Sequence, residues 1–246
     1  MSVRDRIDKL LVEQGLADSR TKAQAMVMAG VVLVDEKRVE KASELFDRDR
    51  VVRIKGDSPE SRYVGRGGLK LEAALDAFAI DPDEFVCIDI GASTGGFTDC
   101  LLKHGARHVT TIDVGTNQLV WKLRNDPRVE VHENTNAREL KPEDLGMRFD
   151  LAVMDVSFIS VTKIIPAIIP LLKPTGRLLV LIKPQFEVGK GEVGKGGVVR
   201  EAEKHARVTE EINAFARELG LRVEGMIESP ILGAEGNKEF LALYGQ

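Results

Sequence analysis

The sequence predicts an α/β protein in which a doubly wound, mainly parallel sheet follows a small α+β domain. From residue 85 onward, apolar β-branched runs alternate with stretches of helical periodicity, the pattern of a parallel sheet joined by crossover helices. Before residue 56, two short amphipathic stretches and two short strands form a separate module. The turn-rich stretch 56–60 divides the two, so we expect domains over 1–60 and 69–246 and a linker over 61–68.

The elements of the small domain follow from spacing and capping signals. A first helix is expected over 4–15, and a second runs from a cap at Ser19 to Gly30, because apolar residues recur at helical spacing in both. Residues 31–34 and 50–55 have the composition of short strands. Together these elements make a compact α+β module.

The larger domain is expected to contain seven strands. They fall at 85–90, 108–114, 129–133, 149–155, 177–183, 221–228 and 238–244, with helices at 69–78, 97–104, 117–125, 160–172 and 201–219. The link between the last two strands is too short for a helical crossover, so that pair should be antiparallel. The other crossovers should be right-handed and place ligands at the carboxyl ends of the strands.

Composition and charge limit the classes of function. The net charge is −4, yet residues 61–70 carry three basic side chains and no acid, which permits a nucleic-acid contact at the junction. Neither the two cysteines nor the histidines have metal-ligand spacing, and no apolar run reaches the roughly 18 residues of a membrane span. We expect a cytoplasmic protein without a metal site, and local hydrogen bonding or solvent exposure for His104, His108, His132 and His205.

Residues 85–97 are the centre of the larger domain, because a buried strand breaks there into a glycine-rich turn and a helix start. A dinucleotide fingerprint is not matched, since Ser93 stands where its second glycine should be, and a phosphate-binding loop would need a lysine at its end. Asp89 before the turn and Asp113 after the next strand fit S-adenosylmethionine better, because its cationic groups and ribose diol suit carboxylates. An ordinary strand-to-helix turn without a ligand stays open.

This interpretation gives each cofactor-binding residue a place. The methionine part of S-adenosylmethionine would lie against the turn, Asp113 would bind the ribose diol and Asn136 would meet the adenine amine. The residues expected on the methionine side are Asp89, Gly91, Ser93, Gly95, Gly96 and Phe97.

Four ionic residues stand at positions that are usually apolar. Asp155 and Lys183 end predicted strands, Glu239 opens the last strand and Lys70 begins the first helix of the larger domain, where the helix dipole disfavours a cation. Burying a lone charge costs several kcal/mol, so such residues are usually paired or functional. We expect the four to meet beside the glycine turn; purely structural ion pairs are the alternative.

The N-terminal module resembles a known RNA-binding module. The phrases at 6–13, 19–24 and 30–35 are similar to the small domain shared by a ribosomal small-subunit protein, pseudouridine synthases and a tyrosyl-tRNA synthetase. The resemblance implies that Arg6, Arg20 and Lys22 contact RNA phosphates, although solvated surface charges would look the same. Phosphate contacts are also expected from Arg62 and Arg66 in the linker, and from Lys190 and Lys195 in a flexible glycine-rich lid at 189–197.

The whole chain resembles the TlyA family. Lys70, Asp155, Lys183 and Glu239 match the Lys-Asp-Lys-Glu set of FtsJ-type ribose 2′-O-methyltransferases, and the phrases at 155–160 and 181–187 extend the likeness. That family carries the historical name hemolysin and is understood to methylate cytidine riboses of ribosomal RNA on a seven-stranded S-adenosylmethionine-dependent methyltransferase sheet. One departure is the linker: that of the family often begins with an arginine before an aromatic-valine pair, and here Ser61 and Tyr63 occupy those places.

The resemblance implies a reaction and roles for the four ionic residues. A ribose hydroxyl needs a base, and lysine is one only when its surroundings favour the neutral amine. Lys183 is the expected base and Lys70 the cation that tunes it, while Asp155 and Glu239 hold the lysines. The expected partner is ribosomal RNA or a ribosomal subunit. An RNA-binding protein with an inactive methyltransferase domain and a membrane-lytic protein are the alternatives.

Overall fold

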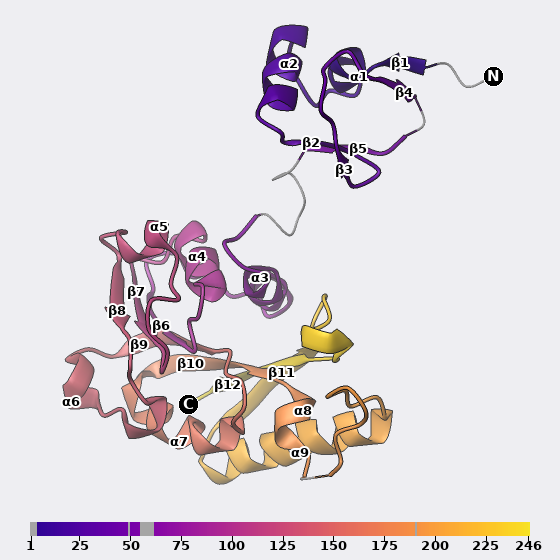
Figure 1. Cartoon of the computed structure of the whole chain (residues 1–246). Helices are drawn as coiled ribbons and strands as arrows, with labels where there is room; N and C mark the ends of the chain where they lie inside the picture. The colour runs from indigo at the N-terminus through magenta and orange to yellow at the C-terminus, as the bar shows by residue number, and fades with distance from the viewer. Residues whose placement is uncertain (1–3, 49, 55–61, 190) are drawn as a thin grey trace. The chain divides into compact units, whose positions relative to one another are not determined.

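The computed structural model describes residues 4–48, 50–54, 62–189 and 191–246 (Figure 1). It falls into two compact units, divided between Arg62 and Tyr63. Tyr63 to Gly67, which lie in the stretch expected as a linker, therefore pack with the larger unit. Tyr63 is buried there and donates a hydrogen bond from its hydroxyl to Glu72 Oε1 at 2.8 Å.

The N-terminal unit packs two helices on short strands. Its elements are β1 (Arg4–Arg6), α1 (Ile7–Glu13), α2 (Arg20–Met28), β2 (Val32–Val34), β3 (Lys37–Arg38), β4 (Leu45–Asp47) and β5 (Val52–Ile54). The Ser19 hydroxyl caps α2 by accepting the Lys22 N–H at 3.2 Å. The expected helix over 4–15 is shorter than predicted, because its first three residues pair with β4 in an antiparallel ladder instead.

The larger unit contains the predicted seven-stranded sheet, in the order β11-β12-β10-β9-β6-β7-β8 (Figure 1). The strands are β6 (Val86–Ile90), β7 (His108–Ile112), β8 (Val129–His132), β9 (Phe149–Met154), β10 (Leu172–Ile182), β11 (Arg222–Glu228) and β12 (Phe240–Gly245). β12 runs antiparallel to both β10 and β11, whereas the pairs among β10, β9, β6, β7 and β8 are parallel. The predicted antiparallel last pair is confirmed.

Helices and 3₁₀ turns connect these strands. They are α3 (Gly67–Ala77), α4 (Gly96–Lys103), α5 (Trp121–Arg124), η2 (Ala137–Glu139), α6 (Pro142–Leu145), η3 (Val161–Lys163), α7 (Ile165–Ile168), η4 (Ile169–Leu171), α8 (Pro184–Glu187), α9 (Ala202–Glu218) and η5 (Ala234–Gly236). Within the described residues, no helix has both the length and the apolar character that crossing a membrane requires.

Two helix predictions in the larger unit are wrong in extent. The expected helix over 117–125 is reduced to α5, since Asn117 has a left-handed φ of 57° that interrupts a helix. The expected helix over 160–172 is broken into η3, α7 and η4. Pro166 and Pro170 explain this break, because proline lacks the N–H that continues a helix.

Side chains alternate along β6 into two hydrophobic layers. Ile88 and Ile90 pack on the face covered by α9, whereas Cys87 packs on the face covered by α3 and α4. All five residues of β6 are buried, as expected for a parallel strand with helices on both faces. Polar groups of the larger unit can therefore reach a ligand mainly where the strands end.

We predict that Gly95→Ala destabilises the larger unit by about 2 kcal/mol or more. Gly95 has φ 98°, and an added Cβ would lie 2.3 Å from Leu123 Cδ1 and 2.7 Å from Leu119 Cδ1. A left-handed non-glycine residue costs roughly 1–2 kcal/mol, and overpacking adds a similar amount. Urea denaturation followed by circular dichroism measures the loss.

Gly146→Ala is the matched control for this variant. Gly146 is also left-handed, at φ 61°, but an added Cβ would meet no atom within 4 Å. It should cost only the backbone penalty of about 1 kcal/mol. Equal losses in the two variants would show that Leu119 and Leu123 yield freely and that packing at Gly95 is unimportant.

Candidate functional site

The loop after β6 is held tightly at the carboxyl edge of the sheet. Gly91 has φ 84°, and a Cβ there would lie 2.4 Å from the Asp155 carbonyl oxygen, so only glycine allows this approach. Ser93, also left-handed at φ 48°, donates its backbone N–H to Asp113 Oδ2 at 2.7 Å. Asp113 Oδ1 accepts the Gly115 N–H at 2.7 Å, so this carboxylate ties the loop after β6 to the loop after β7.

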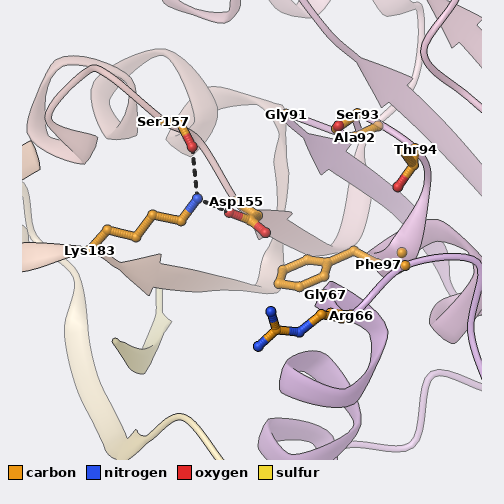
Figure 2. A pocket seen from close by; sticks show the side chains of 12 residues that line it. Arg66, Gly67, Gly91, Ala92, Ser93, Thr94, Phe97, Asp155, Ser157 and Lys183 are labelled. Carbon is orange, nitrogen blue, oxygen red and sulfur yellow. Dashed lines mark hydrogen bonds and ion pairs between the residues drawn. The ribbon is translucent and has the colours of Figure 1, made fainter. Parts of the chain in front are cut away.

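Two cavities border this loop. The smaller, of about 190 Å³, is lined by Gly65, Arg66, Gly67, Gly91, Ala92, Ser93, Thr94, Gly96, Phe97, Asp155, Ser157 and Lys183 (Figure 2). The larger, of about 380 Å³, has apolar walls that include Ile112, Val114 and Ala137. Gly91, Ser93, Asp155 and Ser157 line both cavities. The two therefore form adjoining parts of one site along the strand ends.

Lys183 and Asp155 meet at this edge (Figure 2). Lys183 Nζ lies 2.6 Å from Asp155 Oδ1 and donates a hydrogen bond to Ser157 Oγ at 2.9 Å. The lysine and aspartate side chains are only 12% and 23% exposed, so their attraction is screened less than at the surface. Parallel pairing of β9 with β10 brings them together, because each residue follows directly on its strand.

Ser157 is the polar residue of this cluster that the sequence did not reveal. It lies two positions after Asp155, in the phrase that carried the family resemblance, and the available signal was a hydroxyl just beyond a strand-end carboxylate. A loop conformation decides whether such a hydroxyl turns toward the lysine. Sequence periodicity contains no information on that conformation.

Lys70 and Glu239 form a second, more deeply buried ion pair. Their side chains are 9% and 2% exposed, and Lys70 Nζ donates to Glu239 Oε2. Ile182 pairs with Phe240, so the ladder places Glu239 across from Lys183. A Cβ at Gly67, one turn before Lys70, would lie 3.7 Å from Asp155 Oδ2.

The four ionic residues therefore make two neighbouring ion pairs. The expectation that all four meet beside the glycine turn stays a prediction. Asp155 and Lys183 line the smaller cavity, whereas Lys70 and Glu239 line neither of the two cavities described here.

The structure places most, but not all, of the expected cofactor residues around the cavities. Gly91, Ser93, Gly96, Phe97, Asp113 and Asn136 line one or both of them. Gly95 instead faces Leu119 and Leu123. The Asn136 side chain caps η2 by accepting the Arg138 N–H, and its amide donates to Glu139 Oε1 at 2.7 Å.

Asp89 also departs from its expected place. It is fully buried beneath the loop, where the Thr98 hydroxyl donates to its Oδ2 at 2.6 Å, and it lines neither cavity. Burial raises the pKa of Asp89 to about 7. The reason is topological: β6 is covered on both faces, so an inward side chain in this strand cannot reach a ligand.

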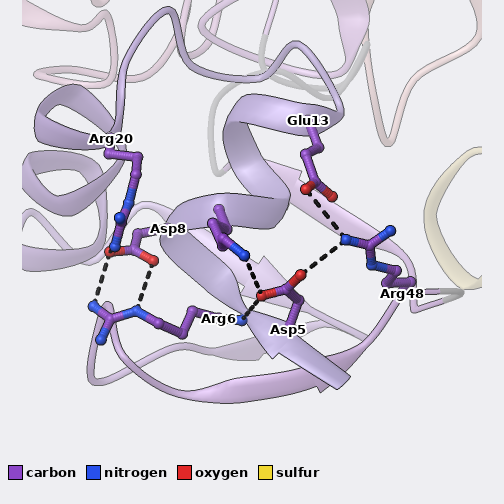
Figure 3. Close-up of polar contacts among 7 residues, drawn as sticks. Asp5, Arg6, Asp8, Glu13, Arg20 and Arg48 are labelled. Atoms are coloured by element: carbon purple, nitrogen blue, oxygen red, sulfur yellow. Dashed lines mark hydrogen bonds and ion pairs between the residues drawn. The ribbon is translucent and has the colours of Figure 1, made fainter. Parts of the chain in front are cut away.

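In the N-terminal unit, Arg6 and Arg20 converge on one buried carboxylate (Figure 3). Arg6 binds both oxygens of Asp8, at 3.0 and 2.9 Å, and Arg20 binds Oδ2 at 3.1 Å. Gln24 donates to the same oxygen at 2.9 Å. Asp8 is 0% exposed, and the hydrogen bonds from Arg6 above all hold its pKa well below the usual range.

The other residues expected to contact RNA have different local surroundings. Lys22 pairs with Asp18 at 2.6 Å, and Arg66 borders the smaller cavity while donating to the Leu232 carbonyl at 2.7 Å. Arg62 and Lys195 are exposed. Lys190 lies outside the described residues.

The end of the glycine-rich stretch is hydrogen-bonded to Asn237, and the flexible lid over 189–197 stays a prediction. Buried Asn237 accepts the Val199 N–H at 3.0 Å and donates to the Gly197 carbonyl at 3.0 Å. His205 Nε2 lies 2.9 Å from the Val199 carbonyl oxygen.

His104, His108 and His132 also lie within hydrogen-bonding distance of nearby groups. Among the described residues, no cluster of histidine, cysteine or carboxylate side chains is arranged to hold a metal ion.

Comparison with known proteins supports both units. Residues 63–246 match the FtsJ-like methyltransferase family, and residues 5–52 match the S4 domain. The chain is 46% identical over 240 residues to the 16S/23S rRNA (cytidine-2′-O)-methyltransferase TlyA of Mycobacterium tuberculosis, covering 98% of this chain and 89% of that protein. It is 43% identical to Hemolysin A of Brachyspira hyodysenteriae, covering 96% and 98%. A solved hemolysin-named protein of Streptococcus thermophilus aligns with TM-score 0.75 and 44% identity, covering 100% and 90%.

We predict that Asp89 makes the larger unit less stable as pH rises from about 4 to about 7. Across that window the unfolded chain has released the Asp89 proton, from an ordinary pKa of 3.8, while the folded chain retains it. The free energy of unfolding should therefore fall with pH, by an amount on the order of 4 kcal/mol at 1.36 kcal/mol per pH unit.

Asp89→Asn isolates this contribution, because the amide does not titrate. Urea denaturation at several pH values should show the difference between the variant and the wild type growing steadily up to about pH 7 and then levelling. A difference that stays constant with pH would contradict the raised pKa of Asp89.

Proposed function

The chain belongs to the TlyA family of ribosomal RNA methyltransferases, and on that premise we propose that it methylates the 2′-hydroxyl of a cytidine ribose in ribosomal RNA. The observation that carries the proposal is the cluster of Lys183, Asp155 and Ser157, which lines a cavity together with the glycine turn. The S4 domain would supply RNA binding.

The residues of the site fit S-adenosylmethionine, which supplies a methyl group activated by its sulfonium sulfur. The apolar walls of the larger cavity suit an adenine ring, and the Asp113 carboxylate at its edge suits a ribose diol. The smaller cavity adds the backbone of the glycine turn and the guanidinium of Arg66, which suit the amino-acid portion. This fit supports S-adenosylmethionine as the methyl donor.

The geometry around Lys183 suits a general base. Asp155 and Ser157 hold Nζ in place, and only when Lys183 has become a neutral amine, with two N–H groups and one lone pair, can its N–H groups point at these two residues. The lone pair is then left for a third direction, toward the cavity that Lys183 lines. A ribose hydroxyl entering there gives its proton to Nζ, and Asp155 stabilises the ammonium that forms.

The buried pair of Lys70 and Glu239 would act on the same hydroxyl. Lys70 lies one helical turn from Gly67, which borders the smaller cavity, so its fixed positive charge favours the alkoxide that develops as the proton leaves. Glu239 holds the ammonium of Lys70 in place and compensates its burial.

The Asp8 cluster supports RNA docking by the small domain. Arg6 and Arg20 each use part of a guanidinium on Asp8, and their side chains remain 40% and 52% exposed. A guanidinium held by a buried carboxylate loses less conformational entropy when its free N–H groups bind phosphate. Asp8 would thus preorganise two phosphate contacts.

We predict that Lys183→Ala lowers the rate of ribose methylation by about 100-fold or more, because a general base contributes roughly 10²–10⁴-fold. Binding of S-adenosylmethionine, measured by calorimetry, should stay within about threefold, since removal of this side chain leaves the glycine turn intact. Transfer of labelled methyl to ribosomal subunits, followed by mapping of 2′-O-methylated nucleotides, measures the rate.

Lys173→Ala is the matched control, because Lys173 lies at the other end of the same strand and is also paired, with Asp150 at 2.8 Å. It should methylate RNA normally. Wild-type protein that binds no S-adenosylmethionine and modifies neither ribosomal subunit would overturn the proposed function.

We also predict that Asp8→Asn weakens RNA binding by about tenfold, although it makes the small domain more positive. Loss of the buried carboxylate charge releases the two arginines from their fixed positions. Fluorescence anisotropy with labelled ribosomal RNA fragments, at several salt concentrations, measures affinity and the number of phosphate contacts.

Asp18→Asn controls for charge alone, because Asp18 is exposed and pairs only with nearby Lys22 among the contacts described. It should bind RNA equally well or more tightly. Tighter binding by Asp8→Asn, with the domain still folded by circular dichroism, would show that net charge rather than preorganisation controls RNA binding.

A further inference from the structure

One helical turn directly follows Lys183 and faces the loop between β9 and η3. Pro184 occupies the first position of α8, where its fixed φ and missing N–H suit a helix start. Lys183 is the N-cap residue of this turn, and its Nζ lies 5.9 Å from the centroid of the Phe186 ring. The base proposed above therefore lies beside an aromatic ring, and Glu187 directly follows that ring in the sequence.

These three residues contact the loop 155–161 in succession. Lys183 binds Asp155 and Ser157 at the start of the loop, and the Phe186 ring lies 5.0 Å from the Phe158 ring between centroids. Glu187 Oε1 accepts the Val161 N–H at 2.9 Å at the end of the loop. The loop is thus fixed at both ends to the segment that carries Lys183.

The Glu187 bond falls at a position where the backbone needs a partner. Val161 is the first residue of η3, and the opening N–H groups of a helical turn have no acceptor within it. Glu187 supplies one, although burial raises the pKa of its carboxyl group against the opposing hydrogen bonds from Ser160 and Val161. Glu187 lines neither of the two cavities, so it does not reach the reacting groups.

The loop that Glu187 holds forms part of both halves of the site. Asp155 and Ser157 border the smaller cavity beside Lys183, and Val156, Phe158 and Ile159 border the larger one. A shift of this loop would move the two acceptors of Lys183 and the wall of the larger cavity together. A misplacement of about 1 Å at an active site can cost roughly 100-fold in rate.

We propose that Glu187 is a positioning residue that fixes the position of the loop 155–161 relative to Lys183. By accepting the Val161 N–H, it holds Asp155 and Ser157 where they orient the lysine, and it holds the wall of the cofactor cavity. This inference rests on the proposed methyl transfer, but its effect on cofactor binding does not depend on the identity of the RNA.

The test compares Glu187→Ala, which removes the acceptor, with Glu187→Gln, which keeps an oxygen at the same position. Glu203→Ala is the matched control, since Glu203 is an exposed glutamate in the first turn of α9. For each full-length variant, calorimetry gives the Kd for S-adenosylhomocysteine, single-turnover assays at saturating cofactor give the methylation rate, and thermal unfolding gives the Tm.

Glu187→Ala should lower the single-turnover rate by about 10-fold to 100-fold and weaken S-adenosylhomocysteine binding by about threefold or more. Glu187→Gln should restore both to within about threefold of the wild type, and Glu203→Ala should match the wild type. A merely structural role would lower the Tm of Glu187→Ala while leaving the rate and Kd of the folded protein unchanged.

The outcomes separate this inference from the proposed function. If wild-type protein methylates no RNA but Glu187→Ala still weakens S-adenosylhomocysteine binding and Glu187→Gln restores it, the proposed function fails and the role of Glu187 stands. If Glu187→Ala keeps wild-type rate and Kd, or Glu187→Gln is as impaired as Glu187→Ala, the positioning role is overturned.

Discussion

The structure of the larger unit depends on one constraint: an ionic side chain inside it needs an opposite charge or hydrogen-bond donors beside it. Helices cover both faces of the sheet, so ionic groups gather where the strands end. There, Lys183 meets Asp155, and Lys70 of α3 meets Glu239, which the β10–β12 ladder places across from Lys183. The pairing offsets the cost of burying these charges and also fixes the orientation of the side chains. A fixed orientation is what electrostatic stabilisation of a reacting group requires.

The small domain uses the same constraint for a different purpose. Its buried acid, Asp8, sits among apolar residues of α1, and it is compensated by side chains from two elements. Interleaved acids in a basic segment look at first like evidence against RNA binding. Here an acid beneath the surface orders the cations above it, so net charge alone is a poor guide to whether such a module binds phosphate.

The sequence predicted the structure correctly wherever a residue pattern has a single physical explanation. Alternating apolar runs predicted all seven strands, and strand-end charges predicted both the Lys183–Asp155 contact and the buried surroundings of Glu239. The predictions failed where tertiary packing decides the conformation or the burial of a residue. The broken helices around Pro166 and Pro170 kept an apolar spacing that suits a continuous helix. Asp89 resembled a ligand group because its place in the motif does not reveal that its strand is covered on both sides. Ser157 and Glu187 act through loop geometry, which leaves no periodic signal.

The strand order has a consequence for how the protein matures during synthesis. β12 is the last strand described along the chain, yet it lies between β10 and β11 and directly follows Glu239. Until the ribosome has released residues 239–245, β11 lacks its described neighbour in the sheet and Lys70 lacks its described counter-ion. The small domain contains all of its own strands and can fold while translation continues. A nascent chain could thus hold RNA before it could modify it, and premature termination would leave a binder without a catalyst.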